Sequence, residues 1–250
     1  VLQAMLAVYR GIRMDLDSFT GEYNRAYALI NLEAVRRNIL MSREKLPENT
    51  GIIAVIKTDA YGHGAVRVAE AVRDITAGFA VAAIEEAVEL REAGIDTHII
   101  VLGYISPKEY RLAIEHDIIL SMFSYEQACL LSQLAGSMGK CGRCHIKIDT
   151  GMNRIGLAAK HEEDIEPTVC EIEKIKSLPN LICDGIFMHF ATADEEDKTK
   201  AKAQYNRFCR VLDELRKKNI EFTYRHCSNS AAIIDMPECT FEWVRQGITL

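Results

Sequence analysis

The sequence has no apolar run that could cross a membrane, since a spanning helix needs about 18 or more consecutive apolar residues. Its opening segment, residues 1–9, is shorter and lacks the basic start and small-residue cleavage site of a signal peptide. Basic residues are not in excess either, because 30 Lys and Arg face 36 Asp and Glu. The net charge of −6 argues against nucleic acid as a partner and favours a small-molecule substrate.

Low-complexity tracts, long linkers and paired metal ligands are also absent. The pair Cys141 and Cys144 has no second pair nearby, so no metal site is expected. Five histidines show no ligand spacing: His63, His98, His116, His145 and His161. Several of the eight cysteines lie inside apolar runs, where a reduced thiol behaves as a small hydrophobe. That usage predicts a reducing, cytoplasmic compartment.

From about residue 52 onward, short apolar runs alternate with longer amphipathic segments, as in repeated β–α units. The expected strands are 51–57, 79–84, 98–103, 118–123, 144–149, 181–190, 222–228 and 243–248. The expected helices are 65–73, 85–93, 107–115, 125–136, 161–176 and 197–218, with a short one after Asn229. This α/β pattern predicts a closed (β/α)8 barrel of the TIM type, with an open doubly wound sheet as the alternative.

The segment before the barrel differs from this alternation. Residues 27–32 are predicted as a strand with no place in the barrel, and residues 33–45 as a helix leading into it. Such a strand needs an edge to pair with, which a further domain would supply. We expect an extension or linker at 1–26 and a barrel domain at 27–250. Because the sequence begins without Met and stops directly behind an apolar run, we expect a fragment.

The first barrel strand ends in a lysine, and functional groups of parallel barrels lie at such carboxyl ends. Lys57 follows four apolar residues, where partial desolvation would expose a nucleophilic amine. Alternatively, a lysine at a strand end only extends to water. Tyr61, Gly62 and Gly64 follow closely, which allows the backbone to approach an anion at a helix start.

The string Ala-Val-Ile-Lys-Thr-Asp-Ala-Tyr-Gly-His-Gly at residues 54–64 resembles the cofactor-lysine motif of alanine racemases, barrel enzymes that use pyridoxal phosphate. Further stretches resemble the same family in the same order: Lys147–Gly156, Gly185–Asp194, and His226–Ala232 with Val244–Ile248. The resemblance covers about residues 26–250. It implies the N-terminal barrel of a racemase, with the family's C-terminal β-domain absent from this chain.

The resemblance implies roles for the residues at the strand ends. Lys57 would hold the cofactor as a Schiff base and act as one of two bases, while Tyr61 contacts the phosphate. Arg154 would reach the cofactor phenolic oxygen and the substrate carboxylate, which both suit a guanidinium fork. Lys147 corresponds to a lysine that is carbamylated in some members, and the resulting anion helps to hold the arginine. His189 would stack on the pyridine ring, although a lone histidine on an apolar strand is more often a core residue.

The last two strands would hold the rest of the cofactor. Ser230, beside Asn229, and the amides of Gly247 and Ile248 resemble the family's phosphate cradle, after strands seven and eight where barrels bind phosphate. Arg245 would face the pyridine nitrogen. Since a guanidinium does not give up its proton, the ring nitrogen would stay unprotonated, and proton transfer would depend on two well-placed bases.

The family's activity gives the expected function. A racemase of this kind interconverts L- and D-alanine by two-base transfer of the α-proton, supplies D-alanine for peptidoglycan, and is a homodimer. Its second base is a tyrosine of the partner subunit's C-terminal domain, so we expect cofactor binding without efficient racemisation from this chain alone.

Two alternatives stay open. One is a serine racemase of the vancomycin-resistance type, which carries a membrane domain upstream; residues 6–10 resemble a helix tail and are compatible with that. The other is a single-barrel pyridoxal-phosphate homeostasis protein, which the length of the chain favours. A purely structural role would require that no cofactor binds, which the convergence of several strand ends argues against.

Overall fold

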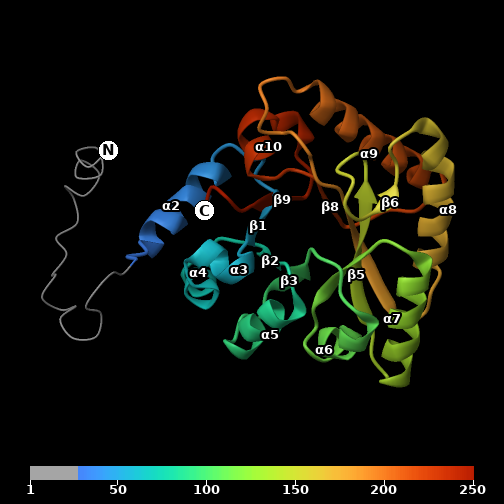
Figure 1. The fold of residues 1–250 in the computed structure, drawn as a ribbon, viewed down its shortest axis with the longest axis horizontal. Helices are drawn as coiled ribbons and strands as arrows, with labels where there is room; N and C mark the ends of the chain where they lie inside the picture. The colour runs from blue at the N-terminus through green and yellow to red at the C-terminus, as the bar shows by residue number, and fades with distance from the viewer. Residues whose placement is uncertain (1–27) are drawn as a thin grey trace, which may run out of the picture. The chain divides into compact units, whose positions relative to one another are not determined.

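The computed structural model describes residues 28–250, of which residues 32–250 form one compact unit. In this unit a ring of parallel strands is surrounded by helices (Figure 1). Nine strands pair in the sheet, and β6 joins only the end of β5, so eight strands form the ring. The ring closes where β9 pairs with β1. The predicted (β/α)8 barrel is therefore confirmed, and the open sheet was wrong.

The barrel strands are β1 (Gly51–Val55), β2 (Gly78–Val81), β3 (His98–Val101), β4 (Ile119–Met122), β5 (Gly142–Asp149), β7 (Leu181–Phe187), β8 (Tyr224–His226) and β9 (Trp243–Gln246), with β6 at Leu157–Ala158. The helices are α2 (Leu32–Arg43), α3 (Lys57–Gly62), α4 (Ala65–Val72), α5 (Ile84–Glu92), α6 (Tyr110–Glu115), α7 (Tyr125–Ser137), α8 (Ile165–Lys176), α9 (Thr199–Lys217) and α10 (Ser230–Asp235). Short 3-10 turns precede α6 (η2, Pro107–Glu109) and α8 (η3, Glu162–Asp164) and follow α10 (η4, Pro237–Cys239). Most strands end two or three residues before the predicted end, because the apolar runs continue into the loops of the carboxyl-end mouth.

Successive residues of a barrel strand pack into two different clusters. Ile52 and Ala54 of β1 pack outward in the large cluster that the strands share with the helices. Ile53 and Val55 point inward and pack in a small cluster with residues of neighbouring strands. Because both faces are buried, the strands read as continuous apolar runs in the sequence, and each fully buried Ile contributes about 1.5–3 kcal/mol.

The prediction of a strand at residues 27–32 was wrong for residues 28–32, the part that the structure describes. Residues 28–31 have no regular secondary structure, and α2 already begins at Leu32. An extended segment becomes a strand only where another strand offers an edge, and residues 28–250 offer none to it. The helix predicted at 33–45 is confirmed as α2, with Val35 and Ile39 buried. Tyr27 and the predicted extension at 1–26 lie outside the described residues.

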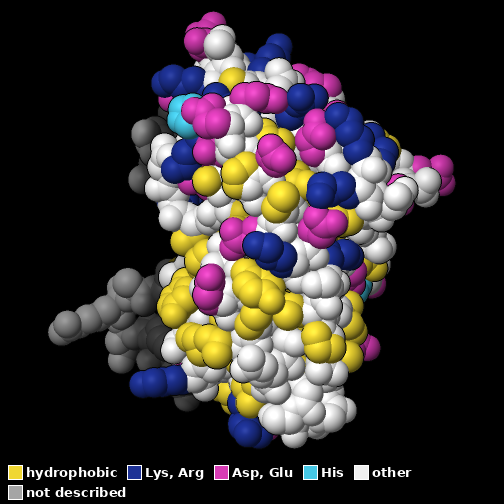
Figure 2. All heavy atoms as spheres, turned by 90° about the vertical axis from the view of Figure 1, so that its right-hand side faces the viewer, with side chains coloured by type: hydrophobic (Ala, Val, Ile, Leu, Met, Phe, Trp, Pro, Cys, Tyr) yellow, Lys and Arg dark blue, Asp and Glu magenta, His cyan; other side chains and the backbone are white. Residues whose placement is uncertain are grey.

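Charged side chains lie mainly on the outer helices. Figure 2 shows the face that carries α7 and α8, with charges of both signs crowded in its upper half and hydrophobic side chains grouped below. Ion pairs join α9 to its neighbours, as Arg210 does to Glu162 and Lys218 to Glu173. Exposed pairs of this kind contribute at most about 1 kcal/mol each, so the core carries the fold. Among the helices of residues 28–250, none is long and apolar enough to cross a membrane.

Candidate active site

A pocket with a volume of about 660 Å³ opens at the mouth where the carboxyl ends of the barrel strands meet. It is lined by every residue that the sequence singled out for cofactor or substrate: Lys57, Tyr61, Lys147, Arg154, His189, Asn229, Ser230, Arg245, Gly247 and Ile248. Lys147 lies in β5 and Arg245 in β9, and the other residues lie in the loops and short helices that follow β1, β5, β7, β8 and β9. The fold thus brings distant segments to one place, as a small-molecule site of a barrel requires.

Lys57 lies two residues after the end of β1 and opens a left-handed turn. Residues 58–61 have φ between 53° and 58°, a region in which each non-glycine residue costs about 1–2 kcal/mol. Carboxylates hold this turn in place: Glu86 accepts the N–H of Thr58 at 2.6 Å, and Asp59 accepts the first N–H of α4 at 2.7 Å. The sequence predicted a glycine-aided helix start here and missed the strained turn, because the residues in it are not glycine.

Tyr61, Ser230 and Gly247 form a cradle beside α10. The hydroxyl of Ser230 accepts the N–H of Gly247 at 2.9 Å, and Asn229 caps α10 with its side chain. A Cβ added to Gly247 would lie 2.7 Å from the hydroxyl oxygen of Tyr61, so glycine lets the tyrosine approach the backbone here. Burial raises the pKa of Tyr61, which keeps its phenol protonated. Ile248 lies exposed at the rim. Hydroxyl and backbone donors at a helix start suit a phosphate group.

Arg245 is buried below the pocket, with 3% of its surface exposed. Its Nη1 donates to Nδ1 of His226 at 2.6 Å, and its Nη2 donates to the carbonyl of Met188 at 2.7 Å. Burial lowers the pKa of Arg245 to about 10, so the side chain is still a cation at neutral pH. A fixed positive charge therefore forms part of the pocket floor.

His189 lies beside this guanidinium, with its Nδ1 3.4 Å from Nη2 of Arg245. Burial, and then the positive charge of Arg245, lower the pKa of His189 to about 2. The imidazole is therefore neutral throughout the physiological range, which excludes it as a source of positive charge in the pocket.

The loop after β5 presents Arg154. Asp149 ends the strand, and its Oδ1 accepts the N–H groups of Gly151 and Asn153, both at 3.0 Å. Gly156 packs so closely on this turn that an added Cβ would lie 2.4 Å from the backbone nitrogen of Asp149. The guanidinium of Arg154 is exposed at the pocket and makes no hydrogen bond or ion pair within residues 28–250, so it is available to an anionic ligand.

Lys147 is buried inside the barrel below Arg154. Its Nζ lies 4.5 Å from the centre of the Phe187 ring. Burial, followed by the charges of Arg245 and Arg154, lowers the pKa of Lys147 well below its ordinary value. Burial and two nearby guanidinium groups thus disfavour the protonated form of this amine.

Sequence reasoning missed part of the pocket and its support. Tyr104, Phe187 and Asp194 also line the pocket, and His226 holds Arg245 from below. A single aromatic or acidic residue in an apolar or loop segment has no sequence pattern that marks it as part of a pocket. Their proximity to the pocket depends on the closure of the barrel.

Comparisons with known proteins agree with this geometry. The family model "Alanine racemase, N-terminal domain" matches residues 30–250. The alanine racemases of Desulforamulus reducens and Methanococcus maripaludis are 43% and 40% identical to the chain, each over 90% of it, and the matches cover 60% and 59% of those proteins. The solved alanine racemase of Clostridium difficile 630 in complex with cycloserine has a TM-score of 0.83 at 38% identity, over 88% of this chain and 59% of that one.

The chain spans about 60% of the length of these curated relatives. The family match extends over nearly the whole described part of the chain, and the fold and the sequence identity point to the same family. The chain belongs to the alanine racemase family, and residues 30–250 are its N-terminal domain.

Proposed function

We propose that this chain is the pyridoxal-phosphate-binding barrel of an enzyme that interconverts L- and D-alanine. The observation that carries the proposal is the convergence of Lys57, Arg154, Arg245 and the Ser230–Gly247 contact on one pocket. The relatives described above are alanine racemases, a family that uses pyridoxal 5'-phosphate.

The pocket residues fit this cofactor. Lys57 supplies the amine for its covalent attachment, and Tyr61, Ser230 and Gly247, which line the same pocket, offer hydroxyl and backbone groups for the phosphate. Arg245 would face the ring nitrogen. When bound, pyridoxal phosphate supplies an electron sink that makes the α-proton of an amino acid acidic.

The side chains of the barrel have separate roles in proton transfer and substrate binding. Lys57 removes or returns the α-proton on one face of the substrate, and Arg154 binds the substrate carboxylate with its free guanidinium. Arg245 stays protonated, so the atom that it faces receives a hydrogen bond but no proton. His189, neutral and partly buried, provides a flat surface next to Arg245.

The second base belongs to a part of the relatives that this chain does not span. In the family it is a tyrosine of the C-terminal domain of a partner subunit, and we propose the same homodimeric arrangement here. D-alanine made in the cytoplasm for peptidoglycan is the corresponding proposed role.

Lys147 is proposed to carry a carbamate. Its neutral amine can add CO2 with the loss of one proton, and the anion formed would lie close to the positive charges of Arg154 and Arg245. That exchange replaces a costly buried amine by a paired anion, which would fix the position of Arg154.

The test is the conversion of L-alanine and of L-serine by the natural polypeptide with pyridoxal phosphate, followed by chiral chromatography. We expect D-alanine to form, and Arg154→Lys to lower kcat/KM about 100-fold because the bidentate contact is lost. Arg111→Lys on the surface of α6 is the matched control. Faster turnover of serine than of alanine would mean that serine is the preferred substrate. Cofactor binding with no turnover of either amino acid would favour the pyridoxal-phosphate homeostasis protein.

A further inference from the structure

A row of polar side chains runs through the barrel interior below Arg245, and the proposed reaction does not use it. His226 of β8 and His145 of β5 are completely buried there. Asp184 of β7 follows them toward the amino ends of the strands. Buried polar groups are costly unless they are paired, so their partners decide what they do.

The contacts in the row are continuous. Nη1 of Arg245 lies 2.6 Å from Nδ1 of His226, and Nε2 of His226 lies 3.0 Å from Nδ1 of His145. Nε2 of His145 lies 3.3 Å from Oδ1 of Asp184. Both of these atoms are buried and make no hydrogen bond within residues 28–250, so this 3.3 Å contact makes each the nearest polar partner of the other.

The two ends of the row determine the direction of every contact. The guanidinium of Arg245 can only donate, and an ionised carboxylate can only accept. Nδ1 of His226 must therefore accept from Arg245, which leaves the proton of His226 on Nε2. That proton is donated to Nδ1 of His145, and the proton of His145 on Nε2 faces Asp184. A second proton on either imidazole would set two donors against each other.

We infer that Asp184 is a positioning residue for Arg245. Its carboxylate holds the proton of His145 on Nε2 and thereby that of His226 on Nε2, so that a lone pair always faces Arg245. The pocket floor is thus oriented from the opposite end of the barrel. The consequence for the cofactor rests on the proposed function, whereas the proton positions do not.

The charges along the row agree with this assignment. Burial lowers the pKa of both His145 and His226, so both are neutral. Burial alone would raise the pKa of Asp184, but the hydrogen bond and charge of His145 and the charge of Arg143 together lower it, and the carboxylate stays ionised.

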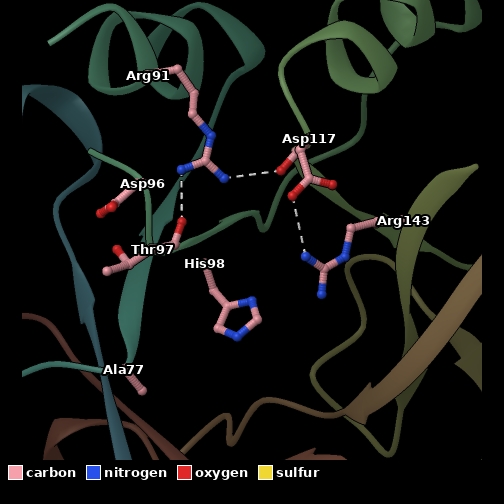
Figure 3. Close-up of a pocket in the computed structure, with 7 residues that line it drawn as sticks. All are labelled: Ala77, Arg91, Asp96, Thr97, His98, Asp117 and Arg143. Carbon is pink, nitrogen blue, oxygen red and sulfur yellow. Dashed lines mark hydrogen bonds and ion pairs between the residues drawn. The ribbon is translucent and has the colours of Figure 1, made fainter. Parts of the chain in front are cut away.

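The far end of the row lies near solvent. Arg143 reaches both Asp184 and Asp117, with contacts of 3.3 and 3.4 Å. Figure 3 shows Arg143 directed at Asp117 beside a second pocket, which lies at the amino ends of the strands and has a volume of about 290 Å³. Arg143 thus holds the second oxygen of Asp184 and leaves Oδ1 for His145.

The first test is nitrogen-15 NMR of the natural polypeptide labelled at histidine, with signals assigned by single substitutions and recorded before and after removal of pyridoxal phosphate. We expect both His145 and His226 to carry the proton on Nε2 and none on Nδ1. A protonated Nδ1 on either residue would overturn the inference, whatever the behaviour of the variants.

The second test is Asp184→Asn, with Asp117→Asn as the matched control. The asparagine has one acceptor, which Arg143 requires, so the amide N–H2 turns to His145. Both histidine protons then reverse, and Nδ1–H of His226 displaces the guanidinium of Arg245, which can no longer donate to it. We expect Nδ1–H signals and about tenfold weaker binding of pyridoxal phosphate in Asp184→Asn, and less than a twofold change in Asp117→Asn.

The outcomes separate the two proposals. Unchanged histidine protons in folded Asp184→Asn would refute the role of Asp184 and leave the proposed function intact. The expected protons in a protein that binds no pyridoxal phosphate would refute the proposed function alone. If Asp184→Asn does not fold, the proton positions of His145 and His226 in the unaltered protein decide whether the inference holds.

Discussion

Burial lowers the pKa of several basic side chains in the pocket, and the ordinary pKa of each residue type decides which of them stays charged. Arg245 is a cation even though burial lowers its pKa to about 10, whereas His189, a few ångströms away, has a pKa of about 2. The pKa of Lys147 is also lowered, because its amine is buried beside two guanidinium groups. One pocket therefore combines fixed cations with neutral nitrogen bases, which suits a site that binds anions and moves protons.

The buried histidines predict how stability depends on pH. His145, His189 and His226 have folded pKa values below the ordinary value of 6.5, so the unfolded chain binds more protons below that pH. Their contribution is fully present above pH 6.5 and is lost as pH falls toward the folded pKa values, by up to about 1.4 kcal/mol per pH unit for each histidine.

Urea unfolding between pH 7.5 and 5 measures this dependence. The midpoint should fall with pH, and His189→Asn should flatten the fall, whereas exposed His161→Asn should not. A midpoint with the same slope in both variants would mean that His189 is not held neutral.

Lys147 gives a second prediction at this scale. A carbamate should appear in native mass spectrometry as the added mass of one CO2, and it should disappear on acidification because carbamates decompose in acid. Lys147→Met should lack the added mass and weaken the hold on Arg154, raising the KM for alanine about tenfold. Exposed Lys108→Met is the control and should keep the added mass of CO2. The same added mass in Lys147→Met would contradict the assignment.

At the scale of elements, the turn after β1 shows what a sequence pattern can and cannot predict. The apolar run that ends in Lys57 predicted both the strand and the side chain at its end. The left-handed conformation of residues 58–61 was not predictable from local preference, since non-glycine residues avoid it. Contacts made by Glu86, on the next β–α unit, hold the turn, and such contacts exist only in the folded barrel.

Thr58→Gly tests the turn. Glycine adopts a φ of 54° without strain, so the substitution should leave stability unchanged or raise it by up to about 1 kcal/mol. Gln133→Gly in the right-handed α7 should instead lower stability by about 1 kcal/mol. Thermal unfolding of both variants gives the comparison, and a loss of stability in Thr58→Gly as large as in Gln133→Gly would count against a left-handed turn.

At the scale of the whole molecule, the alternation of strands and helices predicted the barrel and, with it, the convergence of the pocket residues. Strand order is fixed once eight parallel strands close, so residues at consecutive carboxyl ends must meet. The row from Arg245 to Asp184 was not predictable, because His145 and His226 lie 81 residues apart and meet only across the barrel interior. The strand predicted at 27–32 failed for the complementary reason, since strand formation depends on an edge outside the segment.

The central claim is that Lys57 anchors pyridoxal phosphate in the barrel pocket. The measurement is incubation of the natural polypeptide with pyridoxal phosphate, borohydride reduction to make the attachment permanent, and mass mapping of the labelled peptide, alongside Lys57→Ala and the surface control Lys108→Ala. We expect a label on Lys57 and a visible absorbance band, both absent in Lys57→Ala and unchanged in Lys108→Ala. A label on another lysine, or an equal band in Lys57→Ala, would contradict it.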